Sequence, residues 1–178
     1  MKLNTKSVVF SVILFSLVLL CIEASLQVFY RCSVGMWLHE WWAIPIYEPD
    51  QHRVFRVKPN LDFTHKTREY AVRYYTDSQG MRTDSRRREI PVEKSVDTFR
   101  ILSMGASFAF GWGVNYEDAY VYALAGQLRA RGRNVEMMNL GTPSQPISYQ
   151  LGWLRNIGCR YQPDMIIQTV YGSVDYVD

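Results

Sequence analysis

The stretch Phe99-Arg-Ile-Leu-Ser-Met-Gly-Ala-Ser-Phe-Ala-Phe-Gly-Trp-Gly113 decides the fold of this chain. Its first six residues, Phe99–Met104, form a short apolar run that is typical of a buried strand, and Gly105 marks the end of that run. Ser107 follows two residues after this turn signal. The stretch therefore predicts a strand that ends in a tight turn and then presents a hydroxyl side chain.

The same pattern repeats toward the C-terminus. Two further apolar segments, Val135–Asn139 and Met165–Val170, are predicted strands. The spacing of apolar residues predicts one helix over Glu117–Arg131 and a second that begins near Ile147 and is closed by Gly158. This alternation of apolar strands with helices indicates an α/β fold, with a parallel sheet covered on both faces in three layers.

Each predicted strand ends at a glycine. Right-handed crossovers bring the carboxyl ends of parallel strands to one edge of the sheet, where open α/β sheets bind ligands. We therefore expect Ser107, Gly141 and Gly172 to converge in space. The backbone N–H groups of Ser107 and Gly141 would then both point at a developing oxyanion. The alternative is that the glycines serve backbone geometry alone.

The segment from Tyr47 to Asp97 is expected to form short strands and turns. Arg53–Lys58 alternates polar and apolar residues, and Tyr70–Tyr75 is a second candidate strand. Asp77–Gly80 is a turn signal, because its glycine is free to take a positive φ.

The first thirty residues differ from the rest of the chain. Val8–Ile22 carries no charge, and a helix over Ser7–Tyr30 would be about 36 Å long, enough to cross a bilayer. Lys2 and Lys6 precede it, so the positive-inside rule puts the N-terminus in the cytoplasm and the rest in the periplasm or outside the cell. A cleaved signal peptide and a soluble core helix are the alternatives.

Three tryptophans, Trp37, Trp41 and Trp42, follow this apolar segment. They would either form an interfacial aromatic belt or pack on the domain. The predicted organisation is a cytoplasmic tip with a transmembrane helix (1–31), an interfacial Trp-rich segment (32–46), a strand-and-turn lead-in region (47–97) and an α/β domain (98–178).

The composition excludes several classes of function. Of the 178 residues, 48% are hydrophobic and 21% charged, which excludes intrinsic disorder as the main state. The net charge of +3 is too small to indicate a nucleic-acid partner. The cysteines at 21, 32 and 159 share no close spacing, so neither a disulfide scaffold nor a zinc module is predicted. A Cys32–Cys159 disulfide stays open, and no metal or cofactor is expected.

Four short blocks resemble the SGNH (GDSL-type) hydrolases, in particular their bacterial membrane-anchored members, over roughly Tyr47 to Asp178. The blocks are Thr76–Arg82, Phe99–Gly113, Asn139–Pro143 and Tyr171–Asp175. The resemblance implies the N-terminal part of an SGNH or flavodoxin-like fold and the activity of a serine ester hydrolase. It makes Ser107 the nucleophile and gives the N–H of Gly141 to the oxyanion hole. An Asn of the last block and a late Asp-x-x-His block would complete such a site.

Three departures from the family pattern bear on catalysis. Ala106 stands where the family has Asp, and Val174 stands where it has its oxyanion Asn. The sequence shows no Asp-x-x-His block after Ser107, and all its histidines lie upstream of that residue. A serine hydroxyl without a base and with one oxyanion donor missing should give only weak catalysis. The chain is then either the N-terminal portion of a longer hydrolase or a complete chain that keeps the fold without the chemistry.

Three functions follow from these observations. The first is a membrane-anchored extracytoplasmic esterase that acts on acylated glycans of the bacterial envelope. The second is a pseudoenzyme that serves as a scaffold or accessory subunit of a membrane complex, with its partner at the open edge of the sheet. The third is a glycan- or acyl-binding module. In each case the lipid bilayer is an expected partner and nucleic acid is not.

Overall fold

The computed structural model describes residues 4–34, 37–38, 45–86 and 88–172. The chain separates into two compact units. The first comprises Met1–Pro45 together with Thr67–Glu69, and the second comprises Ile46–Lys66 together with Tyr70–Asp178.

The first unit contains one long apolar helix, α1 (Thr5–Val34). It includes the helix expected over Ser7–Tyr30, and its apolar side chains are exposed. Its length and composition are sufficient to cross a membrane, and a signal sequence near an N-terminus has the same features. Of the expected aromatic belt, Trp41 and Trp42 lie outside the described residues.

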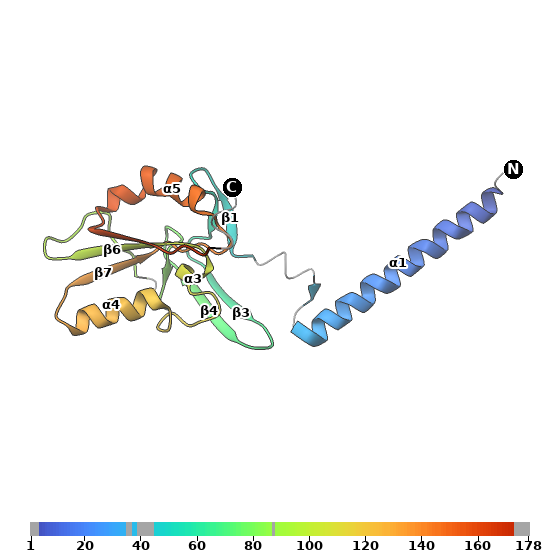
Figure 1. The fold of residues 1–178 in the computed structure, drawn as a ribbon, viewed down its shortest axis with the longest axis horizontal. Helices are drawn as coiled ribbons and strands as arrows, with labels where there is room; N and C mark the ends of the chain where they lie inside the picture. Colours follow the sequence, from blue (N-terminus) through green and yellow to red (C-terminus); the bar gives the residue numbers. More distant parts are fainter. Residues whose placement is uncertain (1–3, 35–36, 39–44, 87, 173–178) are drawn as a thin grey trace. The chain divides into compact units, whose positions relative to one another are not determined.

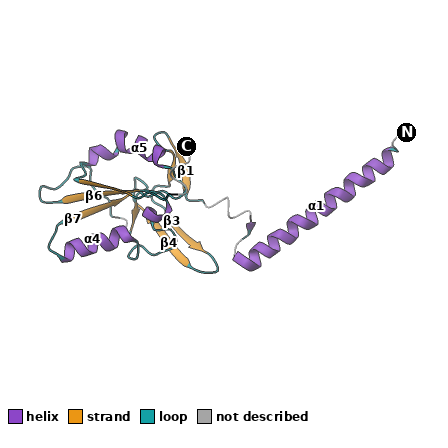
Figure 2. Cartoon of the chain, in the orientation of Figure 1, coloured by secondary structure: helices purple, strands orange, loops and turns teal. Residues whose placement is uncertain are grey.

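The second unit combines strands and helices (Figure 2). Its strands are β1 (Tyr47–Asp50), β2 (Val54–Val57), β3 (Asp62–Lys66), β4 (Ala71–Thr76), β5 (Arg82–Thr83), β6 (Phe99–Met104), β7 (Val135–Asn139) and β8 (Met165–Gln168). Its helices are α3 (Ser107–Phe110), α4 (Tyr120–Ala130), α5 (Ile147–Asn156) and the 3-10 helix η1 (Gly158–Tyr161).

The main sheet is mixed, which corrects the expectation of a purely parallel sheet. Its six strands lie in the order β3-β4-β5-β7-β6-β8. Only β7, β6 and β8 pair in parallel, whereas β3, β4, β5 and β7 join through antiparallel pairs. The physical reason is that the segment expected to lead into the domain supplies three strands to the same sheet. A separate antiparallel hairpin is formed by β1 and β2.

Two apolar clusters cover opposite faces of the parallel strands. Leu102 and Met138 pack with Trp153 of α5, whereas the neighbouring Ile101 and Met137 pack with residues of α4. Adjacent residues of a strand point to opposite faces, so α4 and α5 must lie on the two sides of β6 and β7. Figure 1 shows this arrangement, with the strands between the two helices.

Candidate functional site

Ser107 is the first residue of α3 and lies just beyond the end of β6. Gly105 turns the chain between them with a φ of 149°. A Cβ at this position would lie 2.8 Å from the Ala109 Cβ and 2.9 Å from the Thr169 Cβ, so the turn requires glycine. The Ser107 side chain is half-buried. The sequence therefore places the hydroxyl where the strand–turn–helix pattern predicts it.

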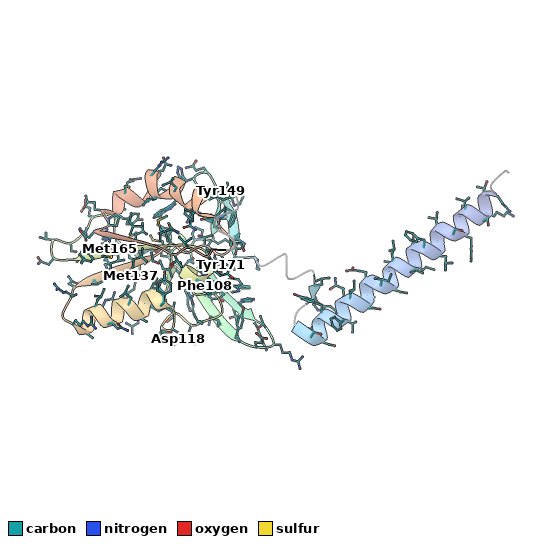
Figure 3. The ribbon with its side chains drawn as sticks, in the orientation of Figure 1. Phe108, Asp118, Met137, Tyr149, Met165 and Tyr171 are labelled. Carbon is teal, nitrogen blue, oxygen red and sulfur yellow. The ribbon has the colours of Figure 1, made fainter. Side chains whose placement is uncertain are left out.

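The carboxyl ends of β6, β7 and β8 meet at one edge of the sheet, as predicted. The N–H of Thr142, after β7, donates to the Gly105 carbonyl at 2.9 Å, and the N–H of Thr169, after β8, donates to the Met104 carbonyl at 2.9 Å. The rings of Phe108 and Tyr171 are 5.3 Å apart, and Figure 3 shows these two side chains together. The residues beside Ser107 and beside Gly172 are therefore in contact.

Gly141 lies against the backbone of α3. A Cβ on Gly141 would fall 2.2 Å from the Phe110 nitrogen and 2.6 Å from the Ala109 carbonyl carbon. Its own N–H donates to Asn139 Oδ1 at 2.9 Å, so this amide already has an acceptor. The structure thus brings Gly141 to the short helix that begins with Ser107, while its oxyanion role stays a prediction.

The β1–β2 hairpin supports the loop that follows β7. The Tyr47 hydroxyl donates to the Pro143 carbonyl at 3.2 Å, and Gln145 Nε2 donates to the carbonyls of Arg53 and Phe55 at 3.1 and 2.7 Å. Gln145 is buried, and burial raises the pKa of Tyr47 to about 12, so the tyrosine remains a neutral donor. Hydrogen bonds between residues about ninety positions apart carry no local sequence signal.

Two buried polar side chains contact the C-terminal end of α3. Arg82 donates to the carbonyls of Phe110 and Gly111, and Asn139 Nδ2 donates to the Ala109 carbonyl. The sequence placed both residues in family-like blocks without giving either a role toward Ser107. The only feature of the sequence that singles out these two residues is their position, Arg82 as the last residue of its block and Asn139 as the first of its block.

The described histidines have hydrogen-bond partners other than Ser107. The His65 Nδ1 lies 3.2 Å from the Tyr70 hydroxyl, its ring is 4.6 Å from that of Trp112, and burial lowers its pKa. His52 pairs with the Gln51 side chain. His39 lies outside the described residues. Within the described ranges, no hydrogen bond joins a histidine to the Ser107 hydroxyl.

Metal and disulfide chemistry find no support in the described part of the chain. No group of three or more His, Cys, Asp and Glu side chains there is arranged to hold a metal ion. Cys21, Cys32 and Cys159 are free thiols. The residues of the third family-like block after Gly172, including Val174, lie outside the described ranges.

Comparisons with known proteins give one partial likeness. No protein-family model matches the chain, and no curated protein matches it. The crystal structure of AlinE4, an SGNH-hydrolase family esterase, is similar over 44% of this chain and 43% of that chain, with 22% sequence identity and a TM-score of 0.39. The similar region thus spans less than half the length of that esterase.

Proposed function

We propose that this chain is a membrane-anchored, SGNH-type serine ester hydrolase with Ser107 as its nucleophile. The observation that carries the proposal is the position of Ser107 at the start of α3, at the edge where β6, β7 and β8 all end. Ligands of open α/β sheets bind at this edge. The length and apolar surface of α1 support the anchor.

The proposed reaction is acyl transfer through Ser107. Its Oγ attacks the ester carbonyl, the serine proton passes to a base, and the alcohol leaves with a proton while the acyl group stays on Oγ. Water then releases the acid and restores the hydroxyl. The Ser107 N–H and the Gly141 N–H are the proposed oxyanion donors. Before it can donate to the oxyanion, the Gly141 N–H must give up its hydrogen bond to Asn139 Oδ1.

No described histidine is hydrogen-bonded to the Ser107 hydroxyl, so the base of this reaction is not identified among the described histidines. A serine hydroxyl is a weak nucleophile without one, and Ala106 stands where the family has an acidic residue. We therefore expect slow turnover by the chain as it stands. Acyl groups on envelope or exported glycans are the proposed substrates, since α1 would hold the domain next to a membrane.

Ester turnover by the full chain in mild detergent tests this function. A 4-nitrophenyl ester series gives the substrate length preference, and Ser107→Ala is the matched variant. We expect slow hydrolysis above background that falls to background in Ser107→Ala, with unchanged thermal unfolding. Equal rates for the two folded proteins would refute the nucleophile assignment.

The exposed edge of the sheet favours a second candidate, a non-catalytic subunit of a membrane complex. The side chains of Met165 and Ile166 on edge strand β8 are 47% and 45% exposed. Exposed apolar edge strands invite pairing with another chain. A stoichiometric partner that is retained by Ser107→Ala and lost in Ile166→Lys would support this role. Glycan binding without turnover would instead support a binding module.

A further inference from the structure

The helix that carries Ser107 cannot hold its own position. α3 contains only four residues, Ser107–Phe110, and an isolated single turn is unstable in water. Its last carbonyls also lack partners within the helix. Contacts from outside α3 must therefore fix the orientation of its first residue.

Arg82 makes three hydrogen bonds at the C-terminal end of α3 and just after it. Its Nη1 donates to the carbonyls of Phe110 at 2.6 Å and Gly111 at 2.5 Å, and its Nη2 donates to the Val114 carbonyl at 2.8 Å. The guanidinium carbon lies 4.9 Å from the ring centroid of Tyr74 and 5.0 Å from that of Phe110. These charge-assisted bonds and ring contacts fix the plane of a side chain that is 3% exposed.

Asn139, the last residue of β7, contacts Ala109, the residue before Phe110 in α3. It pairs with Arg82 across β5 and β7. Its Nδ2 donates to the Ala109 carbonyl at 2.8 Å, while its Oδ1 accepts the Gly141 N–H at 2.9 Å. One amide side chain thus joins the end of α3 to the loop after β7.

The segment held by Arg82 is tied back to Ser107 itself. The Ser107 carbonyl accepts the N–H of Gly111 at 3.0 Å and the N–H of Trp112 at 2.9 Å. A shift at Gly111 would therefore move the backbone of Ser107. The path from the guanidinium to the nucleophile passes through two hydrogen bonds.

Burying the charge of Arg82 costs free energy that a purely structural role would not require. Within the described ranges no carboxylate lies within 4.0 Å of its guanidinium, and its Nε has no hydrogen-bond partner. Burial also lowers the pKa of this arginine. A well-packed apolar side chain often stabilises such a site equally well. What the guanidinium adds is a fixed geometry for several carbonyls at once.

We propose that Arg82 and Asn139 are positioning residues that set the orientation of Ser107 through the C-terminal end of α3. This inference rests on the proposed function, because it assumes that Ser107 reacts. Neither side chain contacts the reacting atoms. They act through the carbonyls of Ala109, Phe110, Gly111 and Val114.

Two measurements on the full chain in mild detergent test the inference. The first is the rate at which a fluorophosphonate probe labels wild type, Arg82→Lys and Asn139→Asp. The second is the hydrogen exchange of the Gly111 and Trp112 amides, which report on the Ser107 carbonyl. Arg73→Lys is the matched control, because Arg73 is an exposed β4 arginine that pairs with Asp62.

We expect Arg82→Lys to label on the order of 10- to 100-fold more slowly than wild type at a temperature where both are folded, with faster exchange at both amides. Asn139→Asp should change both readouts in the same direction, and Arg73→Lys should change neither. Unchanged labelling in a folded Arg82→Lys protein would overturn the positioning role.

The failure of the proposed function is distinguishable from the failure of this inference. If wild type is not labelled, Ser107 is not a reactive nucleophile, and amide exchange alone decides whether Arg82 holds α3. Faster exchange in Arg82→Lys would then support the hold on α3, and unchanged exchange would refute it. If Arg82→Lys does not fold, Asn139→Asp decides both readouts by the same criteria.

Discussion

At the scale of single residues, Gly141 shows how closely the loop after β7 approaches α3. We expect Gly141→Ala to destabilise the protein by about 1–3 kcal/mol, because its Cβ would fall 2.2 Å from the Phe110 nitrogen. Urea unfolding measures the change. Gly126→Ala is the control, because a Cβ there meets nothing within 4 Å and alanine favours a helix by about 0.5–1 kcal/mol. Equal stability of the two variants would contradict this packing.

Asp77 should make stability depend on pH. The residue is 2% exposed, its carboxyl group accepts the N–H groups of Gln79 and Met81, and burial raises its pKa from 3.8 to about 6. Because the folded pKa lies above the unfolded one, the native state binds the proton more tightly. The contribution of the Asp77 proton to the free energy of unfolding is fully present below pH 4 and is lost as the pH rises through 6.

The pH dependence is measured as the free energy of unfolding of wild type and Asp77→Asn between pH 4 and pH 7. We expect wild type to lose on the order of 3 kcal/mol more than the variant across this window, because the Asn side chain does not titrate. Parallel curves for the two proteins would show that Asp77 has no raised pKa.

At the scale of elements, α5 is held to the sheet by Trp153. This side chain is 1% exposed and packs in the cluster that contains Leu102 and Met138. We expect Trp153→Ala to cost about 3–5 kcal/mol in unfolding free energy, whereas Leu151→Ala on the same helix, 40% exposed, should change it by about 0.5 kcal/mol or less. Similar losses from both changes in denaturant titrations would contradict the assigned face of α5.

Some elements could be predicted from the sequence and others could not. β6 and β7 have the predicted bounds, because each is a largely apolar run that ends within two residues of a glycine. β5 was missed because Arg82–Thr83 carries no apolar pattern and exists only through its pairing with β4 and β7. That pairing makes the sheet mixed.

The same limit applies to the site. Topology alone predicted that Ser107 and Gly141 share an edge, because parallel strands end together. The contacts from Arg82 and Asn139 to α3 were not predictable, because they join segments about thirty residues apart in the sequence. Glycine and apolar patterns encode the backbone path, whereas the partners of polar side chains depend on the folded structure.

At the scale of the whole molecule, α1 is the proposed membrane anchor. We expect the wild-type chain to resist alkaline carbonate extraction from membranes. Leu17→Arg should reduce the retained fraction, because an arginine at the centre of a span costs about 2.5–3.5 kcal/mol, and Leu17→Ala should stay closer to wild type. Release of an uncleaved wild-type chain would contradict anchoring. A new N-terminus downstream of α1 would identify a signal sequence instead.

The most direct test of the proposed nucleophile is the location of a covalent adduct. The folded full-length chain is treated with a fluorophosphonate, digested and mapped by peptide mass spectrometry. We predict that the phosphonyl group lies on Ser107 and is absent after denaturation before labelling. A folded protein that carries no adduct, or carries it on Ser103 or Ser144 while Ser107 stays free, would contradict the claim that Ser107 is the reactive residue at this edge of the sheet.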